Sequence, residues 1–321
     1  MTMNNIIEAI KQSSEIAITF HISPDGDSLG SALGLREALI SLGKNVYIMS
    51  KEPVPYNLSF LPNCEIIDGS TFKVLPSTNL VIVLDCGDYK RINAEIDKDN
   101  KAYTLINIDH HLSNEQYGDL NYVDPSCSSI GEIMYTFLEK LEVKITQTIA
   151  ACLYTSIISD TGSFRYSSTT SLTHNIAGKL IDTGIDFSRI HRNVFDDKQF
   201  SMIKFLGRAI DNMKLVSDKI CLIKIKNSDF LDFEVDPTVD TAHIIALGLE
   251  VKSVEVAVLL KESQDKIKVS LRSKDNADVR SIAEKFDGGG HKKAAGLTIN
   301  NMTIDEAEKL ILEEIEKELI K

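Results

Sequence analysis

The chain has 321 residues, a formal net charge of −12 and a hydrophobic fraction of 43%. This length accommodates two domains of ordinary size, and the composition is typical of a globular protein. The negative charge argues against a protein that coats long or duplex nucleic acid, because such binding depends on many Lys and Arg contacts with phosphate groups. It leaves open a small phosphorylated substrate, since bound divalent cations would reverse the local charge.

The cysteines and the N-terminus indicate where the protein resides. The five cysteines are scattered and form no Cys-x-x-Cys pair, which argues against a disulfide scaffold and against a cysteine zinc site. Residues 1–13 lack the pattern of a signal peptide, and no apolar run approaches the length of a membrane span. We therefore expect a cytoplasmic protein that does not act at a membrane.

Apolar strands and amphipathic helices alternate in the first part of the chain. Strands are predicted at residues 16–20, 45–49, 80–84 and 104–108, and helices at residues 5–12, 28–42, 129–141, 146–158 and 172–182. Continuously apolar strands in such an alternation are typical of a mostly parallel sheet that is covered on both faces. The pattern predicts an α/β domain over residues 1–186.

The pattern changes after about residue 184. Residues 187–217 are predicted to form a helical linker, and residues 218–321 a second, smaller α/β domain, with a cleft between the domains. In this part, strands are predicted at 220–225, 254–260, 266–271 and 297–299, and helices at 279–286 and 304–320. A polar turn at 261–265 and a glycine loop after residue 286 separate these elements.

The stretch from His21 to Ser28 places one imidazole and two carboxylates, those of Asp25 and Asp27, between a predicted strand and a predicted helix. Open α/β sheets bind ligands at the carboxyl ends of their strands, so these side chains are expected to face a common centre. Two carboxylates this close repel each other unless a cation lies between them. The alternative is that Asp27 and Ser28 only cap the helix and that His21 is a buried polar residue.

Further acidic and histidine residues fall at equivalent places. Asp85 and the sequence Asp109-His110-His111 each follow an apolar strand, and Asp160 ends an apolar helix. Asp85 alone could be a simple turn residue. Two adjacent histidines after a strand are harder to dismiss, because the chain has seven histidines in all.

Together these residues form a set of nitrogen and oxygen ligands: His21, Asp25, Asp27, Asp85, His110 and Asp160. Imidazole and carboxylate without thiolate suit Mn²⁺ or a similar ion better than structural zinc. Six ligands suit two ions about 3.5–4 Å apart, bridged by one carboxylate and a water. Such a pair activates the water for in-line attack on phosphorus and neutralises charge in the transition state.

In their order along the chain, these motifs resemble the four motifs of the DHH phosphoesterases. The sequence Gly288-Gly289-Gly290-His291, with the residues that follow it to Gly296, is similar to the glycine–histidine motif of the DHH-associated substrate domain. The resemblance covers nearly the whole chain. It implies a DHH catalytic domain followed by a domain that binds the substrate.

The resemblance also implies a role for each site residue. One metal ion would be held by His21, Asp25 and Asp85, and the other by Asp27, Asp85, His110 and Asp160. Asp85 would then bridge the two ions, and Asp109 would orient the ligands. His111 would contact phosphate and help the leaving oxygen depart.

The second domain contributes a predicted phosphate site. Consecutive glycines let backbone N–H groups approach a phosphate, and His291 adds a donor, although a flexible turn is the alternative. From Lys252 to Lys293 there are ten Lys or Arg against seven Asp or Glu, which favours an anionic ligand. Arg272 resembles a substrate-binding arginine of the family, and Arg165 is a weaker candidate; each could instead be an ordinary surface arginine.

Within the family, the compact form resembles the enzymes that degrade very short RNA. We therefore expect Mn²⁺-dependent hydrolysis of short oligoribonucleotides to mononucleotides and removal of the 3′-phosphate of adenosine 3′,5′-bisphosphate (pAp). A phosphodiesterase for cyclic di-AMP or pApA shares the same motifs, so the preferred substrate stays open. A nucleotide sensor without catalysis is a further alternative, and the protein could be a monomer or a homodimer.

Overall fold

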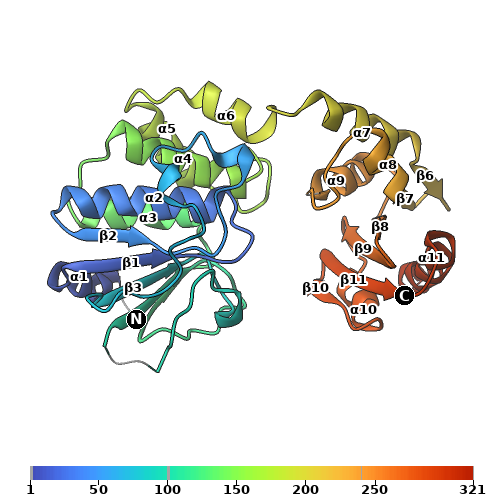
Figure 1. The fold of residues 1–321 in the computed structure, drawn as a ribbon. Coiled ribbons are helices and arrows are strands. Elements are labelled where there is room, and N and C mark those ends of the chain that lie inside the picture. The colour runs from blue at the N-terminus through green and yellow to red at the C-terminus, as the bar shows by residue number, and fades with distance from the viewer. Residues whose placement is uncertain (1–2, 100–101, 240, 321) are drawn as a thin grey trace. The chain divides into compact units, whose positions relative to one another are not determined.

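The computed structural model describes residues 3–99, 102–239 and 241–320. These residues form two compact units, with the boundary between Asp197 and Lys198 (Figure 1). None of the helices in these ranges combines the length and the apolarity needed to cross a lipid bilayer.

The N-terminal unit is built on a sheet of five parallel strands in the order β2-β1-β3-β4-β5. Its strands are β1 (Glu15–Thr19), β2 (Asn45–Ile48), β3 (Leu80–Leu84), β4 (Thr104–Asp109) and β5 (Leu120–Val123). The predicted α/β fold with a mostly parallel sheet is thus confirmed. The edge strand β5 was not predicted, because its four half-buried residues form no continuous apolar run.

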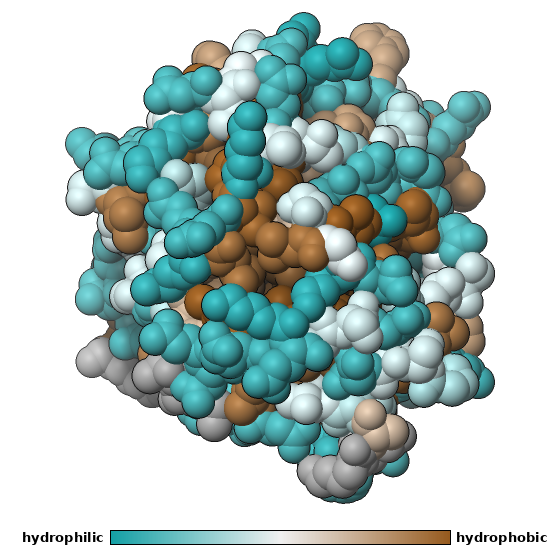
Figure 2. All heavy atoms as spheres, turned by 90° about the vertical axis from the view of Figure 1, so that its left-hand side faces the viewer, coloured by the Kyte–Doolittle hydropathy of each residue, from teal (hydrophilic) through white to brown (hydrophobic). Residues whose placement is uncertain are grey.

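Helices cover one face of this sheet, and turn-rich segments lie on the other (Figure 1). The helices are α1 (Met3–Gln12), α2 (Gly26–Ser41), α3 (Ile130–Lys140), α4 (Gln147–Asp160), α5 (Ser171–Ile181) and α6 (Phe187–Phe195). The second face, which includes Ala17 and Val81, is covered by Ile92, Ala94 and Tyr103 from the irregular segment between β3 and β4. Hydrophobic side chains also gather in one area of the unit's surface, surrounded by hydrophilic ones (Figure 2).

Helices α2 and α4 pack unusually closely through Gly30. A Cβ atom at Gly30 would lie 2.4 Å from the carbonyl oxygen of Cys152 in α4, so the two helices meet at the backbone. This approach brings the first turn of α2 beside the second half of α4. The contact therefore fixes the distance between Asp27 and Asp160, which lie on these two helices.

The residues predicted as a helical linker divide between the two units. Val194 and Phe195 of α6 pack against the core of the N-terminal unit. Phe205 and Ala209 of the next helix, α7 (Phe200–Asp211), belong to a core cluster of the C-terminal unit.

The C-terminal unit contains a six-stranded mixed sheet in the order β10-β11-β9-β8-β7-β6, in which only β7 and β8 are parallel. Its strands are β6 (Lys214–Val216), β7 (Ile220–Ile225), β8 (Val256–Ser263), β9 (Lys266–Ser273), β10 (Gly289–His291) and β11 (Ala294–Asn300). Besides α7, its helices are α8 (Asn227–Asp232), α9 (Ala242–Glu250), α10 (Val279–Glu284) and α11 (Ile304–Ile320). Helices α10 and α11 pack on one face of the sheet, and α7, α8 and α9 on part of the other.

The prediction of a glycine loop after residue 286 was wrong for residues 289–291. Gly289, Gly290 and His291 form the edge strand β10, which pairs with residues 294–296 of β11 in an antiparallel hairpin. Glycine lowers strand propensity, so the sequence signal favoured a loop. The pairing with β11 supplies the order that the local sequence does not.

The close contact of α2 with α4 gives a testable prediction. Gly30→Ala should destabilise the protein by about 1–3 kcal/mol, because the new Cβ would overlap the Cys152 carbonyl and force the helices apart. The matched control is Gly178→Ala in α5, where a Cβ meets no atom within 4 Å, so this change should be neutral or stabilising by about 0.4–1 kcal/mol. Urea unfolding followed by circular dichroism measures both, and equal effects would contradict the role of Gly30.

Candidate metal centre

The carboxyl ends of β1, β3 and β4 bring the predicted ligands together. Strand order reverses between β1 and β3, since β2 lies on one side of β1 and β3 lies on the other. His21 follows β1, Asp85 follows β3, and His110 and His111 follow β4. Such a switch point is where open α/β sheets form ligand sites.

One group of three side chains consists of His21, Asp25 and Asp85. His21 Nε2 lies 3.5 Å from Asp25 Oδ2 and 3.3 Å from Asp85 Oδ2, while Nδ1 is 2.8 Å from the carbonyl oxygen of Ile22. Asp25 is also the N-cap of α2, because its Oδ1 accepts hydrogen bonds from the backbone N–H groups of Asp27 and Ser28. The cap holds Asp25 so that its other oxygen faces His21.

The second group surrounds His110. Its Nε2 lies 3.6 Å from Asp27 Oδ2, 3.6 Å from Asp85 Oδ1 and 3.5 Å from Asp160 Oδ2. The ring is oriented by Nδ1, which lies 3.2 Å from the carbonyl oxygen of Cys127. All six predicted metal ligands thus fall into two groups that share Asp85.

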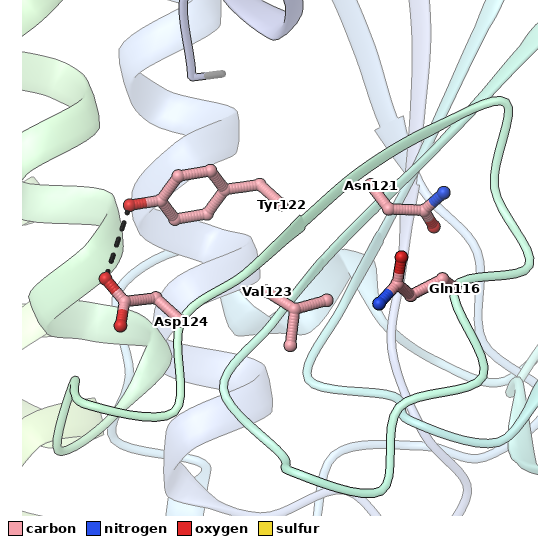
Figure 3. A pocket seen from close by; sticks show the side chains of 5 residues that line it. All are labelled: Gln116, Asn121, Tyr122, Val123 and Asp124. Atoms are coloured by element: carbon pink, nitrogen blue, oxygen red, sulfur yellow. Dashed lines mark hydrogen bonds between the residues drawn. The ribbon is translucent and has the colours of Figure 1, made fainter. Parts of the chain in front are cut away.

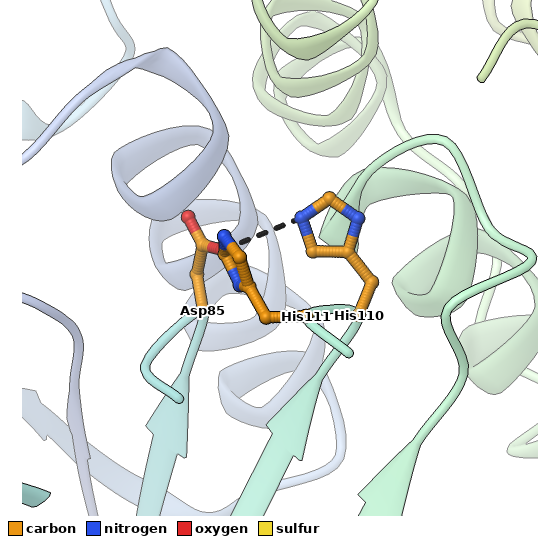
Figure 4. A group of neighbouring side chains, drawn as sticks. All are labelled: Asp85, His110 and His111. Carbon is orange, nitrogen blue, oxygen red and sulfur yellow. Dashed lines mark ion pairs between the residues drawn. The ribbon is translucent and has the colours of Figure 1, made fainter. Parts of the chain in front are cut away.

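His111 and Asp109 form a pair beside these groups. Asp109 is fully buried and accepts hydrogen bonds from His111 Nδ1 at 2.8 Å and from the Asn114 amide. His111 Nδ1 also lies 3.6 Å from Asp85 Oδ1, and 44% of its side chain is exposed. The rings of His110 and His111, from neighbouring positions after β4, lie next to each other on one side of Asp85 (Figure 4).

Asp27 is held by backbone and hydroxyl groups from two other helices. Its carboxylate accepts hydrogen bonds from the N–H groups of Ile130 and Gly131 at the start of α3, and from the Ser156 hydroxyl of α4. The N-terminus of a helix stabilises a negative charge. Asp27 is 1% exposed, so these bonds replace the water that an ionised carboxylate would otherwise require.

The charge of the site is unbalanced without a cation. Burial opposes the protonation of His21 and His110, but the neighbouring carboxylates outweigh it and raise both pKa values to about 10. Burial raises the pKa of Asp160 to about 6 and, with the charges of Asp85 and Asp160, raises that of Asp27 well above its usual value. The pKa of Asp85 is lowered despite its burial, because His110 and His21 face it.

The donor set and one orphaned atom fit a pair of divalent cations. Asp85 Oδ1 is buried and accepts no hydrogen bond from any residue that the structure describes. Two histidine nitrogens lie 3.6 Å from it, beyond hydrogen-bond distance, so this oxygen could serve as a ligand of a cation. Once ionised, the four carboxylates of Asp25, Asp27, Asp85 and Asp160 would carry four negative charges, which two divalent cations would neutralise.

One hollow of the N-terminal unit lies apart from this cluster. A hollow of about 290 Å³ lies along the edge strand β5 and is lined by Gln116, Asn121, Tyr122, Val123 and Asp124 (Figure 3). None of the six clustered ligands lines it. The candidate site therefore rests on the geometry of the side chains.

Comparison with known proteins agrees with this geometry. Two family models match: "DHH family, N-terminal domain" over residues 15–157 and "DHHA1 domain" over residues 234–321. The chain is 30% identical to the bifunctional oligoribonuclease and PAP phosphatase NrnA of Thermus thermophilus, over 99% of this chain and 94% of the relative. The chain belongs to the DHH family.

Further similarities cover the length of this DHH protein. The protein of the same description from Bacillus subtilis is 31% identical over 95% of each chain. The crystal structure of an exopolyphosphatase-related protein from Bacteroides fragilis superimposes with a TM-score of 0.90 at 28% identity and covers 98% of this chain and 95% of that one. The crystal structure of RecJ with Mn²⁺ from Thermus thermophilus has a TM-score of 0.55 at 13% identity, covers 98% of this chain and 54% of that one, and shows the shared fold alone.

The predicted substrate residues of this DHH protein lie in both units. In the C-terminal sheet, His291 of β10 pairs with Ala294 of β11, which pairs with Arg272 of β9, so His291 and Arg272 share one row and one face. Gly288 precedes β10, and Gly289 and Gly290 lie within it. Arg165 belongs to the N-terminal unit, and its Nε donates to the carbonyl oxygen of Gly162, 3.0 Å away.

No role was predicted from the sequence for Ser156 or Asn114. Ser156 precedes Asp160 by one helical turn, a spacing that could have placed both on the same face of α4. Asn114 donates to Asp109 and to Asn107, but no pattern in the sequence marks it. Ser156 thus holds a predicted ligand, Asp27, and Asn114 holds Asp109 beside the two groups.

The raised pKa values predict that metal binding releases protons. At pH 7 the metal-free protein holds protons on His21 and His110, whose pKa values are about 10, and each ring must lose a proton to bind a cation. Mn²⁺ affinity should therefore increase with pH, and at least two protons should leave at pH 7. Calorimetric Mn²⁺ titrations in two buffers of different ionisation enthalpy measure this number, and identical heats in both would contradict the prediction.

The support of Asp27 gives a second prediction. Ser156→Ala removes a hydroxyl donor to a buried carboxylate, so Mn²⁺ affinity should fall about 10- to 100-fold. Thr148→Ala, two turns earlier on α4, is the matched control and should leave the affinity unchanged. If both variants bind Mn²⁺ like the wild type, Ser156 does not position Asp27.

Proposed function

We propose that the protein is a metal-dependent phosphoesterase that hydrolyses short oligoribonucleotides to mononucleotides and removes the 3′-phosphate of pAp. The observation that carries this proposal is the convergence of six imidazole and carboxylate side chains in two groups that share Asp85. Full-length similarity to relatives described as bifunctional oligoribonuclease and PAP phosphatase supports the choice of substrates.

The ligands divide naturally between two cations. In this proposal one ion takes His21, Asp25 and Asp85, and the other takes Asp27, Asp85, His110 and Asp160. Nitrogen and carboxylate oxygen ligands suit Mn²⁺. Two such ions, when bound, supply an activated water and neutralise the charge of the phosphate in the transition state.

The chain's own residues position the reacting groups. Asp109 accepts a hydrogen bond from His111 Nδ1, which raises the pKa of His111 and leaves Nε2 as the free side of the ring. We assign to His111 the delivery of the Nε2 proton to the leaving oxygen. Its half-exposed side chain lets it reach a substrate, whereas His110 is turned toward three carboxylates.

In this proposal, residues other than the six metal ligands bind the substrate. Arg272 and His291, which share a row of the C-terminal sheet, would bind a phosphate beside the glycines Gly288, Gly289 and Gly290. The N–H group of Gly288 already donates to the carbonyl oxygen of Ala283, so Gly288 would contribute the close approach of its backbone and not a donor. The backbone of Gly289 is open, because a Cβ there would meet no atom within 4 Å. Arg165, five residues after Asp160, would contact the substrate from the N-terminal unit.

A side-by-side assay with Mn²⁺ tests the proposal on pAp, a pentaribonucleotide, pApA, cyclic di-AMP and pyrophosphate. We expect turnover of pAp and of the pentaribonucleotide. Turnover of pApA and cyclic di-AMP alone would favour the phosphodiesterase. Binding of pAp without phosphate release would instead identify a nucleotide sensor.

Asp85 offers the sharpest variant. Asp85→Ala should reduce kcat on every substrate by about 10³-fold or more, because both ions would lose a ligand. Asp182→Ala, at the exposed end of α5, is the matched control and should retain wild-type turnover. Thermal unfolding of both variants separates lost chemistry from lost structure, and near-normal turnover in Asp85→Ala would refute the shared ligand.

A further inference from the structure

One face of the C-terminal sheet, which we call the open face, carries exposed or half-buried residues on strands β9, β11 and β10, although α9 also approaches β9. Helices α7, α8 and α9 cover Cys221 and Ile223 of β7 and Ala257 and Leu259 of β8 on this face. The residues of β9 and β11 that continue the same face are exposed or half-buried: Lys266, Lys268, Ser270, Arg272, Ala294, Gly296, Thr298 and Asn300. The alternating residues of both strands point into the core under α10 and α11.

The open face is basic in an acidic protein. Strands β9, β10 and β11 contain no Asp or Glu, although the chain has a formal net charge of −12. Lys266 and Lys268 form no ion pair with any residue in the described part of the chain. By contrast, Lys224 on β7 pairs with Asp305 and Glu308 of α11, which packs on the other face. Unpaired lysines side by side favour an anionic ligand.

The pairing register orders this face into rows that run across the strands. Arg272, Ala294 and His291 form the first row, and Ser270, Gly296 and Gly289 form the second. Lys268 and Thr298 form the third row. Successive rows are two residues apart along each strand, so the third row lies about 13 Å from the first.

The second row is nearly free of side chains. A Cβ at Gly289 would meet no atom within 4 Å, and one at Gly296 would meet only the Val269 carbonyl oxygen, at 3.6 Å. The sheet therefore presents bare backbone between two rows that carry cationic side chains. A flat nucleobase, or a compact ribose, can approach such a surface closely.

We propose that this open face binds the second and following nucleotides of a short oligonucleotide. Lys268 and Thr298 contact a backbone phosphate, and the row of Ser270, Gly296 and Gly289 receives the sugar or base that precedes it. The inference rests on the proposed function in one respect, because Arg272 and His291 are taken to hold the terminal nucleotide. A mononucleotide such as pAp ends before the third row, so Lys268 sets the preference for oligonucleotides over pAp.

Lys268→Glu tests this assignment in two ways. The ratio of KM for a pentaribonucleotide to KM for pAp should rise about three- to tenfold, since a screened contact between a lysine and a phosphate is replaced by repulsion. Binding of a fluorescently labelled pentaribonucleotide in EDTA, followed by anisotropy, should weaken by a similar factor. The slope of log Kd against log salt should decrease by about 0.7 for the lost phosphate contact.

Two more variants complete the experiment. Lys309→Glu makes the same charge change on α11, which covers the opposite face, and should leave the KM ratio and the anisotropy unchanged. Gly296→Val fills the second row and should also raise the KM ratio. Gly296 has no positive φ, so the strand accepts valine without backbone strain.

The outcomes separate this inference from the proposed function. An unchanged KM ratio in Lys268→Glu, or an equal rise for pAp and the pentaribonucleotide, overturns the role of the open face. If the wild type hydrolyses neither substrate, the proposed function fails. The anisotropy in EDTA still decides whether Lys268 binds the oligonucleotide, because that measurement requires no turnover.

Discussion

Repulsion among closely spaced carboxylates is the constraint on which the N-terminal unit depends. Four aspartates converge on the ends of three parallel strands, and two histidines face them. In the absence of a cation, the neighbouring carboxylates raise the pKa values of the two histidines, and burial together with those carboxylates raises the pKa of Asp27. The same fold that assembles the ligands therefore makes the protein compete with protons for its metal ions.

The fold meets this constraint with backbone dipoles and hydroxyl groups rather than with lysine or arginine. The start of α3 and the Ser156 hydroxyl hold Asp27, and the first turn of α2 holds one oxygen of Asp25. These groups orient the carboxylates without adding a full positive charge that would exclude a cation. The close packing of α2 on α4 at Gly30 sets the spacing of the two helices that carry Asp27 and Asp160.

The sequence predicted the elements that carry strong local signals. The apolar runs of β3 and β4 end where carboxylates begin, so Asp85 and Asp109 could be placed at strand ends without a structure. Short strands with weak strand propensity were not predicted, as β5 and the glycine-rich β10 show. The groups that hold the side chains of the site in place were not predicted either. Asn114 and the N–H groups at the start of α3 act through contacts between residues far apart in the fold.

Register between distant strands is the other property that no local pattern could supply. Arg272 and His291 are 19 positions apart in the sequence, and only the pairing of β9, β11 and β10 puts them in one row. The open, basic face follows from that pairing. The division of the six ligands between two ions, and the roles given to Arg165, Arg272 and His291, stay predictions.

Asp85 adopts a left-handed backbone conformation, with φ of 54°. For residues other than glycine this conformation costs about 1–2 kcal/mol, and aspartate is among the residues that tolerate it best. Glycine would relieve the strain but would remove the carboxylate that faces both histidines. The protein thus gives up some conformational stability at a position whose side chain the candidate metal site requires.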